Sequence, residues 1–596
     1  MAALKIENLI TDHLDLWSAA VRPKSSAGRG SNSKLELTGI KKLRELILEL
    51  AVRGKLVPQD PNDEPASVLL ERIAVEKARL VKEKKIKKEK PLSAISEDEK
   101  PFELPKGWEW CRFEDIVDIQ SGITKGRKLT NRVLTTVPYL SVANVQRGYV
   151  DVTGIKSVEL PVDEVEKYQV LTGDLLITEG GDWDKVGRTA IWADEMPYVA
   201  HQNHVFKARK FLQEQDESWL EMFLNGPSAR DYFAGSSKQT TNLASINKTQ
   251  LRGCLIAIPP KNEKSCIVAK VDELMTLCDQ LELRSESQLA AHQTLVETLL
   301  ATLTDSSDAD ELAQNWARLS THFDTLFTTE ASIDALRYTI LQLAVMGKLV
   351  PQDPSDEPAS ALLERIASEK ARLVKNKTIK QEKSLPEISE EEKLYRVPSS
   401  WCFCRLGEIC YGITSGSTPP KDKFLESGGV PYLKVYNIRD QKIDFDYQPQ
   451  FVVKDYNESK LKRSMLYPGD VVMNIVGPPL GKVAIIPNTY PVWNCNQAIV
   501  FFRPIDSQIN TYIYTYLVTG LFLRSIELIG TAGQDNISVT KSRLIVLPVP
   551  PLAEQHRIVA KVDELMALCD QLKSRLQTSQ QTQLALAESL VEGALA

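Results

Sequence analysis

The chain has 596 residues, 43% hydrophobic and 26% charged, and its 73 basic and 79 acidic side chains give a net charge of -6. This length is several times that of a usual domain, so we expect three to four folding units. The composition argues against a disordered, collagen-like or mucin-like chain. The acidic balance argues mildly against nucleic-acid binding, because phosphate neutralisation needs Lys and Arg.

The first 20 residues lack the basic and apolar stretches of a secretory signal, and no window approaches the roughly 18 apolar residues that a membrane span needs. We therefore expect a cytoplasmic protein. The nine cysteines are odd in number and lie mostly in apolar stretches, which is typical of reduced thiols. Cys402, Cys404 and Cys410 lack the paired spacing of zinc ligands, and we expect no metal site.

Residues 1–100 are predicted to be a helical region. Leu43 to Val52 and Ala66 to about Lys88 have helical apolar spacing, and Gly54 is a plausible helix stop. The Lys-rich run at residues 77–90 is expected to be a solvated helix face, with contact to DNA phosphates as the alternative. Ser and Gly at residues 25–33 indicate a flexible loop.

Residues 101–260 read as a compact α/β domain of short strands and Gly, Pro and Asn turns. The loop at 122–128 carries cations that could hold phosphates, and the loops at 201–204 and 236–242 carry side chains that could pair with base edges. Plain solvated loops, or a strand-end histidine, are the alternative. The candidate DNA-binding residues here are Lys125, Arg127, Lys128, Gln202, Asn203, His204, Lys238, Gln239 and Asn242.

Residues 261–395 form a second predicted helical region. It begins with some 41 residues, Glu263 to Leu303, that would span roughly 60 Å as one helix. A 3-4-3 apolar spacing indicates a coiled-coil seam, interrupted at Gln288 and His292. The seam positions are Val271, Leu274, Cys278 and Leu281.

An internal repeat with a spacing near 293 residues organises the chain. Gly54 to Pro61 returns unchanged as Gly347 to Pro354, and Ile267 to Met275 returns as Ile558 to Met566. Between such shared regions the two copies keep only a skeleton of common residues. Shared regions can bind two copies of one partner, whereas the variable domains between them can bind two different things.

Residues 396–550 are the second variable domain, with predicted strands at 469–476 and 497–502 and a helix near 512–529. Residues 551–596 are predicted to be a C-terminal coiled-coil helix. The candidate DNA-binding residues of this domain are Ser415, Ser417, Thr418, Lys421, Lys423, Gln534 and Asn536. The seam positions of the last helix are Val562, Leu565, Cys569 and Leu572.

The order of motifs in the second variable domain, which the first repeats less closely, resembles the target-recognition domain of type I restriction-modification specificity subunits. These motifs are residues 412–419, 428–433, 469–472, 481–484, 496–498, 537–538 and 550–555. The resemblance implies an α+β fold with two globular α/β target-recognition domains, each flanked by helical shared regions. Long antiparallel coiled-coil helices with pseudo-twofold symmetry would hold these domains apart.

The same resemblance implies a subunit that reads the two halves of an asymmetric bipartite site in double-stranded DNA. Two methyltransferase subunits would dock on the shared helices, and restriction-translocase subunits would join them. S-adenosylmethionine, ATP and Mg²⁺ would be used by those other subunits, and this chain would bind no cofactor.

No catalytic motif contradicts a non-catalytic role. Gly477 to Lys482 has the wrong spacing and composition for a phosphate loop, and we find no methyltransferase, zinc-protease or carboxylate-lysine nuclease pattern. A self-contained nuclease or methyltransferase is therefore disfavoured. The alternative is a two-headed coiled-coil scaffold whose variable domains bind protein or carbohydrate, which the charge balance does not exclude.

Overall fold

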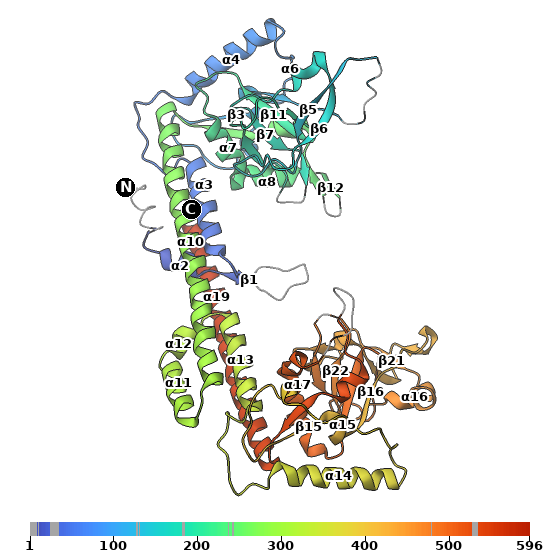
Figure 1. Cartoon of the computed structure of the whole chain (residues 1–596). Coiled ribbons are helices and arrows are strands. Elements are labelled where there is room, and N and C mark those ends of the chain that lie inside the picture. The colour runs from blue at the N-terminus through green and yellow to red at the C-terminus, as the bar shows by residue number, and fades with distance from the viewer. Residues whose placement is uncertain are drawn as a thin grey trace. The chain divides into compact units, whose positions relative to one another are not determined.

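The computed structural model describes residues 9, 11–23, 35–124, 126, 129, 131–181, 185–236, 238–240, 243–477, 479–526, 528 and 535–595. These form two compact units, the first of residues 1–288 with 579–596 and the second of residues 289–578. Each unit contains long helices and mostly antiparallel sheets, which confirms the α+β class (Figure 1).

The first unit begins with the helices α2 (Leu14–Ala19), α3 (Thr38–Val52) and α4 (Ala66–Lys82). Gly54 follows α3 with a φ of 65°, and a Cβ there would lie 2.7 Å from the ring of Pro105. The predicted helix stop is therefore confirmed, since only glycine fits both conditions. The prediction that the next helix reaches Lys88 is wrong, because α4 ends at Lys82 and Lys84 takes a left-handed φ of 58° that no helix continues through.

The first variable domain is built from short strands in small sheets. Its strands are β3 (Glu109–Arg112), β4 (Val117–Gln120), β5 (Leu134–Leu140), β6 (Lys156–Pro161), β7 (Leu175–Thr178), β8 (Gly180–Gly181), β9 (Thr189–Ile191), β10 (Ala200–His201), β11 (Val205–Lys210), β12 (Lys238–Thr240), β13 (Leu243–Ser245) and β14 (Leu255–Ile258). Its helices are α5 (Phe113–Ile116), α6 (Val165–Tyr168), α7 (Glu217–Asn225), α8 (Pro227–Ser236) and α9 (Lys248–Gly253).

The central sheet of this domain has the order β4-β11-β7-β9, and all its strands are antiparallel. Every residue of β7 is buried, so β7 carries the core, with α7 packed beside β9. A second sheet has the order β10-β5-β6, in which β10 runs parallel to β5. The order β12-β13-β8 forms a third sheet, and β14 pairs with β3.

The second unit repeats this plan after the helices α11 (Ala309–Thr321), α12 (Phe323–Leu326), α13 (Glu330–Val345) and α14 (Ala359–Lys375). Its strands are β15 (Cys402–Arg405), β16 (Cys410–Ser415), β17 (Phe424–Leu425), β18 (Val430–Leu433), β19 (Ile438–Arg439), β20 (Lys442–Ile443), β21 (Phe451–Val452), β22 (Val471–Asn474), β23 (Val483–Ile485), β24 (Asn494–Cys495), β25 (Ile499–Pro504) and β26 (Val546–Val549). Its further helices are α15 (Leu406–Ile409), α16 (Lys454–Ser459), α17 (Asn510–Val518) and α18 (Val539–Arg543).

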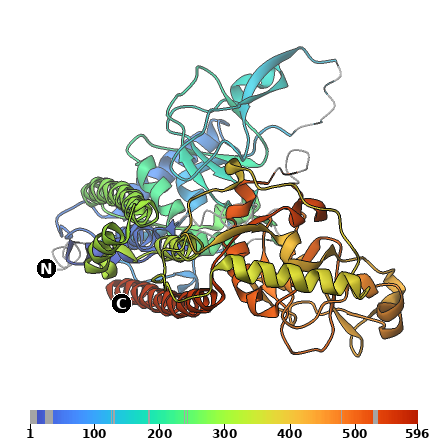
Figure 2. The same ribbon diagram turned by 60° about the horizontal axis from the view of Figure 1, so that its bottom comes forward.

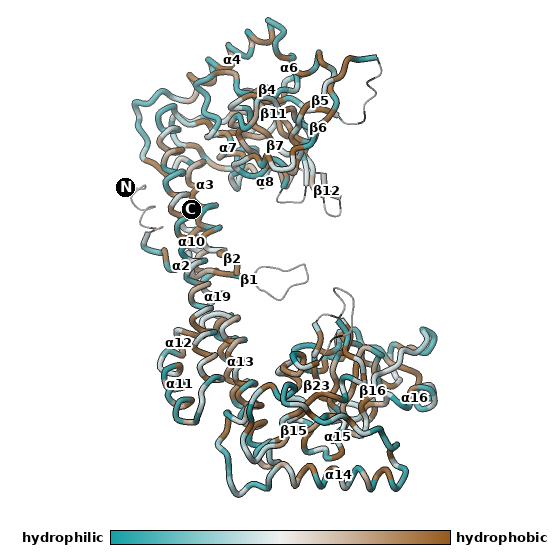
Figure 3. The backbone as a smooth tube through the Cα atoms, viewed as in Figure 1, coloured by the Kyte–Doolittle hydropathy of each residue, from teal (hydrophilic) through white to brown (hydrophobic). Residues whose placement is uncertain are grey.

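The central sheet of the second domain, β16-β25-β22-β23, matches the order of the first, and β24 again runs parallel to its neighbour, β18. The strands of both domains are largely hydrophobic (Figure 3). Helix α14 lies along the second variable domain (Figure 2). Its residues Leu362 and Ile366 are buried together with Trp401 in the core of that domain. The helix predicted near residues 512–529 is shorter, because Gly520 takes a φ of 64° after α17.

Two residues of the common skeleton have the same structural role in both domains. The Asp174 carboxylate accepts two hydrogen bonds from Arg209, each of 2.7 Å, and the Asp470 carboxylate accepts two from Arg503, of 2.8 and 2.5 Å. Both carboxylates are buried. The Gly-Asp pair retained between the copies therefore belongs to the fold rather than to a binding surface.

The long helices are α10 (Lys261–Asp305) and α19 (Leu552–Leu595), of 45 and 44 residues. The boundary between the units falls inside both, so each helix contributes to both units. In the first unit, Arg44 on α3 donates to Asp279 and Glu282 on α10, both at 2.7 Å. In the second, Arg337 on α13 donates to Asp570 on α19 at 2.5 Å.

The predicted seam positions are mostly buried. Val271, Leu274 and Cys278 are buried in α10, whereas Leu281 is partly exposed. In α19, Val562 joins the core of the second variable domain. A separate cluster contains buried Cys569 and partly buried Leu565 and Leu572, together with residues of α13 and the last turns of α10. No helix among the described residues is both long and apolar enough to cross a membrane.

Candidate nucleic-acid interface

The turn between β10 and β11, residues 201–205, lies between two other backbone segments of the first domain. The Ile123 amide donates to the His201 carbonyl at 2.8 Å, and the Glu179 amide donates to the His204 carbonyl at 2.9 Å. Because main-chain bonds hold both sides of the turn, its position does not depend on its side chains. We call residues 201–205 the first turn. Its backbone holds the polar side chains of the turn in a fixed position.

The two histidines of the first turn differ in environment. His201 is fully buried, its Nδ1 lies 2.7 Å from the Val205 carbonyl oxygen, and burial lowers the pKa of its imidazole to about 3. It is a core histidine. His204 is half-exposed, and its Nδ1 lies 2.5 Å from Glu179 Oε2. Gln202 and Asn203 are partly exposed, so three candidate side chains share one surface.

A hairpin lies next to the first turn. Strand β13 pairs with β8, and the Ile246 amide donates to the Glu179 carbonyl at 2.9 Å. The backbones of the candidates Lys238 and Gln239 belong to β12 of this hairpin. The candidates Lys125, Arg127, Lys128 and Asn242 lie outside the described residues.

The second domain brings the corresponding segments together at residues 495–499, which we call the second turn. The Ser417 amide donates to the Cys495 carbonyl at 3.1 Å, and Thr418 Oγ1 donates to Gln497 Oε1 at 3.0 Å. Ser415 lies on β16, opposite Val500. Two of the predicted candidates, Ser417 and Thr418, therefore contact this turn.

Asn536 forms an isolated bridge with Val476, next to the second turn. The side-chain oxygens of Asn496 and Asn536 are enclosed without a hydrogen-bond partner in the described part of the chain. An enclosed acceptor without a partner is costly unless a ligand satisfies it. The candidate Gln534 falls on residues that the structure does not describe.

The lysine candidates of the second domain lie on the short 3-10 helix η4 (Lys421–Lys423). Lys421 is exposed. Lys423 is paired with Asp422 at 2.9 Å, and this pair raises the pKa of Lys423. Because Asp422 offsets the charge of Lys423, Lys421 is the stronger candidate for a phosphate contact.

Sequence reasoning missed three residues of these surfaces. Asn496 and Gln497 stood in a family motif but were not predicted as DNA contacts, although their place in the second turn matches that of Gln202 and Asn203. Glu179 had no sequence signal, because it lies 25 residues before its partner His204.

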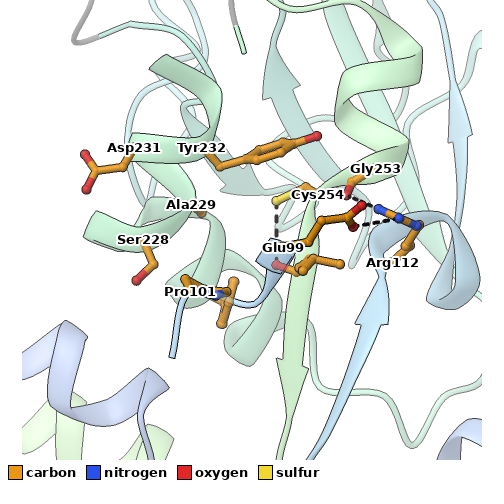
Figure 4. Close-up of a pocket in the computed structure, with 11 residues that line it drawn as sticks. Glu99, Pro101, Arg112, Ser228, Ala229, Asp231, Tyr232, Gly253 and Cys254 are labelled. Atoms are coloured by element: carbon orange, nitrogen blue, oxygen red, sulfur yellow. Dashed lines mark hydrogen bonds and ion pairs between the residues drawn. The ribbon is translucent and has the colours of Figure 1, made fainter. Parts of the chain in front are cut away.

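A cavity of about 520 Å³ lies elsewhere in the first unit, beside α8 (Figure 4). Its Arg112 is bonded to Glu99 at 2.8 Å and to the Gly253 carbonyl at 3.2 Å. Burial raises the pKa of the Cys254 thiol, and burial also raises the pKa of Tyr232 to about 12. The charged pair is satisfied internally, and neither the Cys254 thiol nor the Tyr232 hydroxyl is activated.

Comparison with known proteins decides the family. Residues 105–291 and 398–579, more than half of the chain, match the family model described as the type I restriction modification DNA specificity domain. The chain belongs to the type I specificity subunit family. The predicted resemblance and its class of function, DNA target recognition, are thereby confirmed, and the scaffold for protein or carbohydrate is not supported.

Two relatives align with this specificity subunit along its length. The specificity subunit of the type I restriction enzyme EcoAI of Escherichia coli is 42% identical, and that of EcoEI is 43% identical. Each alignment covers 99% of this chain and 100% of the relative. A solved structure from work on complex assembly of the type I R-M system has 17% identity and a TM-score of 0.48, over 83% of this chain and 99% of that one.

Proposed function

We propose that this specificity subunit reads the two halves of one bipartite duplex site, one half with each variable domain, and has no catalytic activity of its own. One observation carries the proposal: the turns of the two domains have the same backbone hydrogen bonds but different side chains. Both domains hold a turn against a glycine-containing loop and a sheet edge, yet the turns carry different polar residues. Different side chains on one platform suit the reading of different bases.

The first turn with its hairpin and the second turn with residues 415–418 are the proposed base-reading surfaces. Gln and Asn can bond adenine through its N6 and N7 atoms. Lys421 and Lys423 in the second domain, with Lys125, Arg127 and Lys128 in the first, would hold backbone phosphates and position each domain.

The shared helices would bind the other subunits of the complex. Helices α4 and α14 repeat almost the same sequence, so two methyltransferase subunits could each meet the same surface. Helices α10 and α19 would pair as an antiparallel coiled coil relating the halves by a pseudo-twofold axis, with domain limits as predicted from the sequence. Restriction-translocase subunits would complete the complex, and S-adenosylmethionine, ATP and Mg²⁺ would act only in the partner subunits.

The proposal is tested by purifying the complex through this chain and then mapping, across a genome, the DNA sites that the complex methylates. The expected pattern is a bipartite site, and exchange of residues 113–255 for another family member's domain should change one half of it. A single uninterrupted site, or a change in both halves, would contradict the proposal. Turnover by the purified chain alone with DNA and S-adenosylmethionine would contradict its non-catalytic role.

A further inference from the structure

The two turns are built on the same four backbone hydrogen bonds, although their sequences differ. In the first domain these bonds, of 2.8 to 2.9 Å, run from the amides of Ile123, Gln202, Val205 and Glu179 to the carbonyls of His201, Leu140, Gln202 and His204. In the second domain, at 2.8 to 3.2 Å, they run from the amides of Ser417, Asn496, Ile499 and Ile475 to the carbonyls of Cys495, Leu433, Asn496 and Ala498.

A glycine lies against each turn at the same point. A Cβ on Gly122 would lie 2.1 Å from the carbonyl oxygen that begins the first turn, and one on Gly416 would lie 2.0 Å from its counterpart in the second. This contact fixes the alignment. Residues 202–204, Gln-Asn-His, correspond to residues 496–498, Asn-Gln-Ala.

At the third position of these aligned segments, residues 204 and 498, one domain has a polar side chain and the other has none. The carboxylate of Glu179 can only accept, so the Nδ1 of His204, 2.5 Å away, carries the proton of this hydrogen bond. In the neutral form of the ring, Nε2 is then an acceptor. In the second domain the equivalent residues are Ala498 and Ile475, which have no polar side-chain atom, and Ile475 is buried.

We propose that these two turns read the bases for the two domains, and that residues 204 and 498 differ in whether they can bond a base. The Nε2 of His204, oriented by Glu179, accepts a hydrogen bond from the exocyclic amino group of adenine or cytosine in the major groove. Glu179 is a positioning residue. Ala498 makes no polar contact at the equivalent place. This inference rests on the proposed function, that both domains read DNA.

Selection from a randomised duplex library with the purified full chain, followed by sequencing of the bound molecules, tests the assignment. His204→Ala should weaken the preference for one base pair in one half-site roughly 2- to 12-fold, because one hydrogen bond is lost rather than a bidentate pair. Glu179→Ala should weaken the preference at the same base pair, and Glu179→Gln, which keeps an acceptor for Nδ1, should restore most of it.

Glu159→Ala is the matched control. Glu159 is exposed on β6, which lies across β5 from the strand that leads into the first turn, so its loss should leave both half-sites unchanged. The exchange of residues 202–204 for Asn-Gln-Ala should alter only the half-site that His204→Ala alters.

The outcomes separate the two levels of the argument. A wild-type chain that selects no sequence would refute the proposed function. A wild-type chain that selects a bipartite site, with variants of residues 202–204 that select the same site, would refute the assignment of readout to the turns. A His204→Ala variant that changes both halves equally would refute it too.

Discussion

At the residue scale, an arginine at the start of each variable domain holds the segment before it, which we call the strap (residues 93–99 and 386–392). Arg405 is 2% exposed and bonds to both oxygens of Glu392, each at 2.9 Å. It also donates to the carbonyls of Pro386, Glu387 and Leu544 at 2.7 to 2.9 Å. One planar guanidinium thus joins the strap to the segment that leads into β26, which a lysine could not do.

Arg405→Met should destabilise the second unit by about 3 kcal/mol, because it leaves three backbone carbonyls and the partly exposed Glu392 carboxylate without their donor. Hydrogen exchange of the β26 amides should then be faster by roughly 100-fold. Arg112→Met, the equivalent change in the first domain, is the location control and should leave β26 unaffected. Unchanged exchange in Arg405→Met would contradict the role given to this side chain.

Glu221 on α7 gives a pH-dependent prediction. Burial raises the pKa of its carboxyl to about 7, although its Oε1 accepts a 2.9 Å hydrogen bond from the Ile191 amide. The folded pKa lies above the ordinary value near 4.3, so ionisation opposes folding increasingly as pH rises from about 4 to 7.

Glu221→Gln should therefore raise the stability of the first unit at pH 8 by roughly 1 to 3 kcal/mol and have little effect at pH 4. Thermal unfolding at the two pH values checks this, with the exposed Glu159→Gln as control. An equal effect at both pH values would show that the carboxyl titrates normally.

Sequence patterns predicted the residues of the first turn but not their environments. Gln202, Asn203 and His204 stand out as a polar cluster, and the structure leaves Gln202 and Asn203 partly exposed and His204 half-exposed. The burial of His201 and the approach of Glu179 depend on tertiary packing. No local pattern contains that information, because it arises from strands that are distant in the chain.

At the scale of elements, ion pairs join the shared helices differently in the two units. Arg44 and its repeat Arg337 both meet an aspartate of the neighbouring long helix. The repeat of Glu282 is Lys573, which lies 3.6 Å from carboxylates of both Glu330 and Asp334. Charge at this contact is thus reversed between the copies while the helix packing is retained.

Arg44→Glu should destabilise the contact of α3 with α10 by about 1 to 2 kcal/mol, because it replaces attraction to two acids by repulsion at a partly exposed site. Hydrogen exchange of α3 should rise, while that of α13 stays constant. Arg44→Glu combined with Glu282→Arg should recover part of the loss. Failure of the second change to restore protection would show that packing, not charge, joins these helices.

The lengths of the helices were predictable where the apolar period continues and a breaker ends it. The helix predicted at 263–303 is two residues longer at each end, and Gly54 ends α3 as predicted. The end of α4 was not predictable, because Lys84 takes a left-handed φ that lysine rarely adopts. The end of α17 carried a signal that the prediction passed over, since Gly520 follows its last residue as Gly54 follows α3.

At the scale of the whole molecule, residues 579–595 complete the first unit. Lys55 Nζ donates to the Leu595 carbonyl at 2.7 Å, Lys42 pairs with Glu588 at 3.1 Å, and Ala587 is fully buried. The first unit is therefore built from two stretches of sequence that lie far apart.

Truncation after Thr578 should leave the second unit intact and remove from the first unit the partners of Lys42 and Lys55, at and just after α3. Hydrogen exchange of α3 should become markedly faster, and α13 should keep its protection. A separately added peptide of residues 579–595 should slow the exchange of α3 again. Unchanged protection of α3 in the truncated chain would show that these residues only rest on a completed unit.

The division of α10 and α19 between the units has a consequence for synthesis. About 290 residues separate the two parts of the first unit. At 5 to 20 residues per second, a ribosome needs roughly 15 to 60 s to make them. During that interval the first variable domain can fold, but Lys42 and Lys55 lack their partners Glu588 and Leu595. Any translation stop within this interval yields a chain whose first unit lacks residues 579–595, and chaperones and proteases can recognise such an incomplete unit.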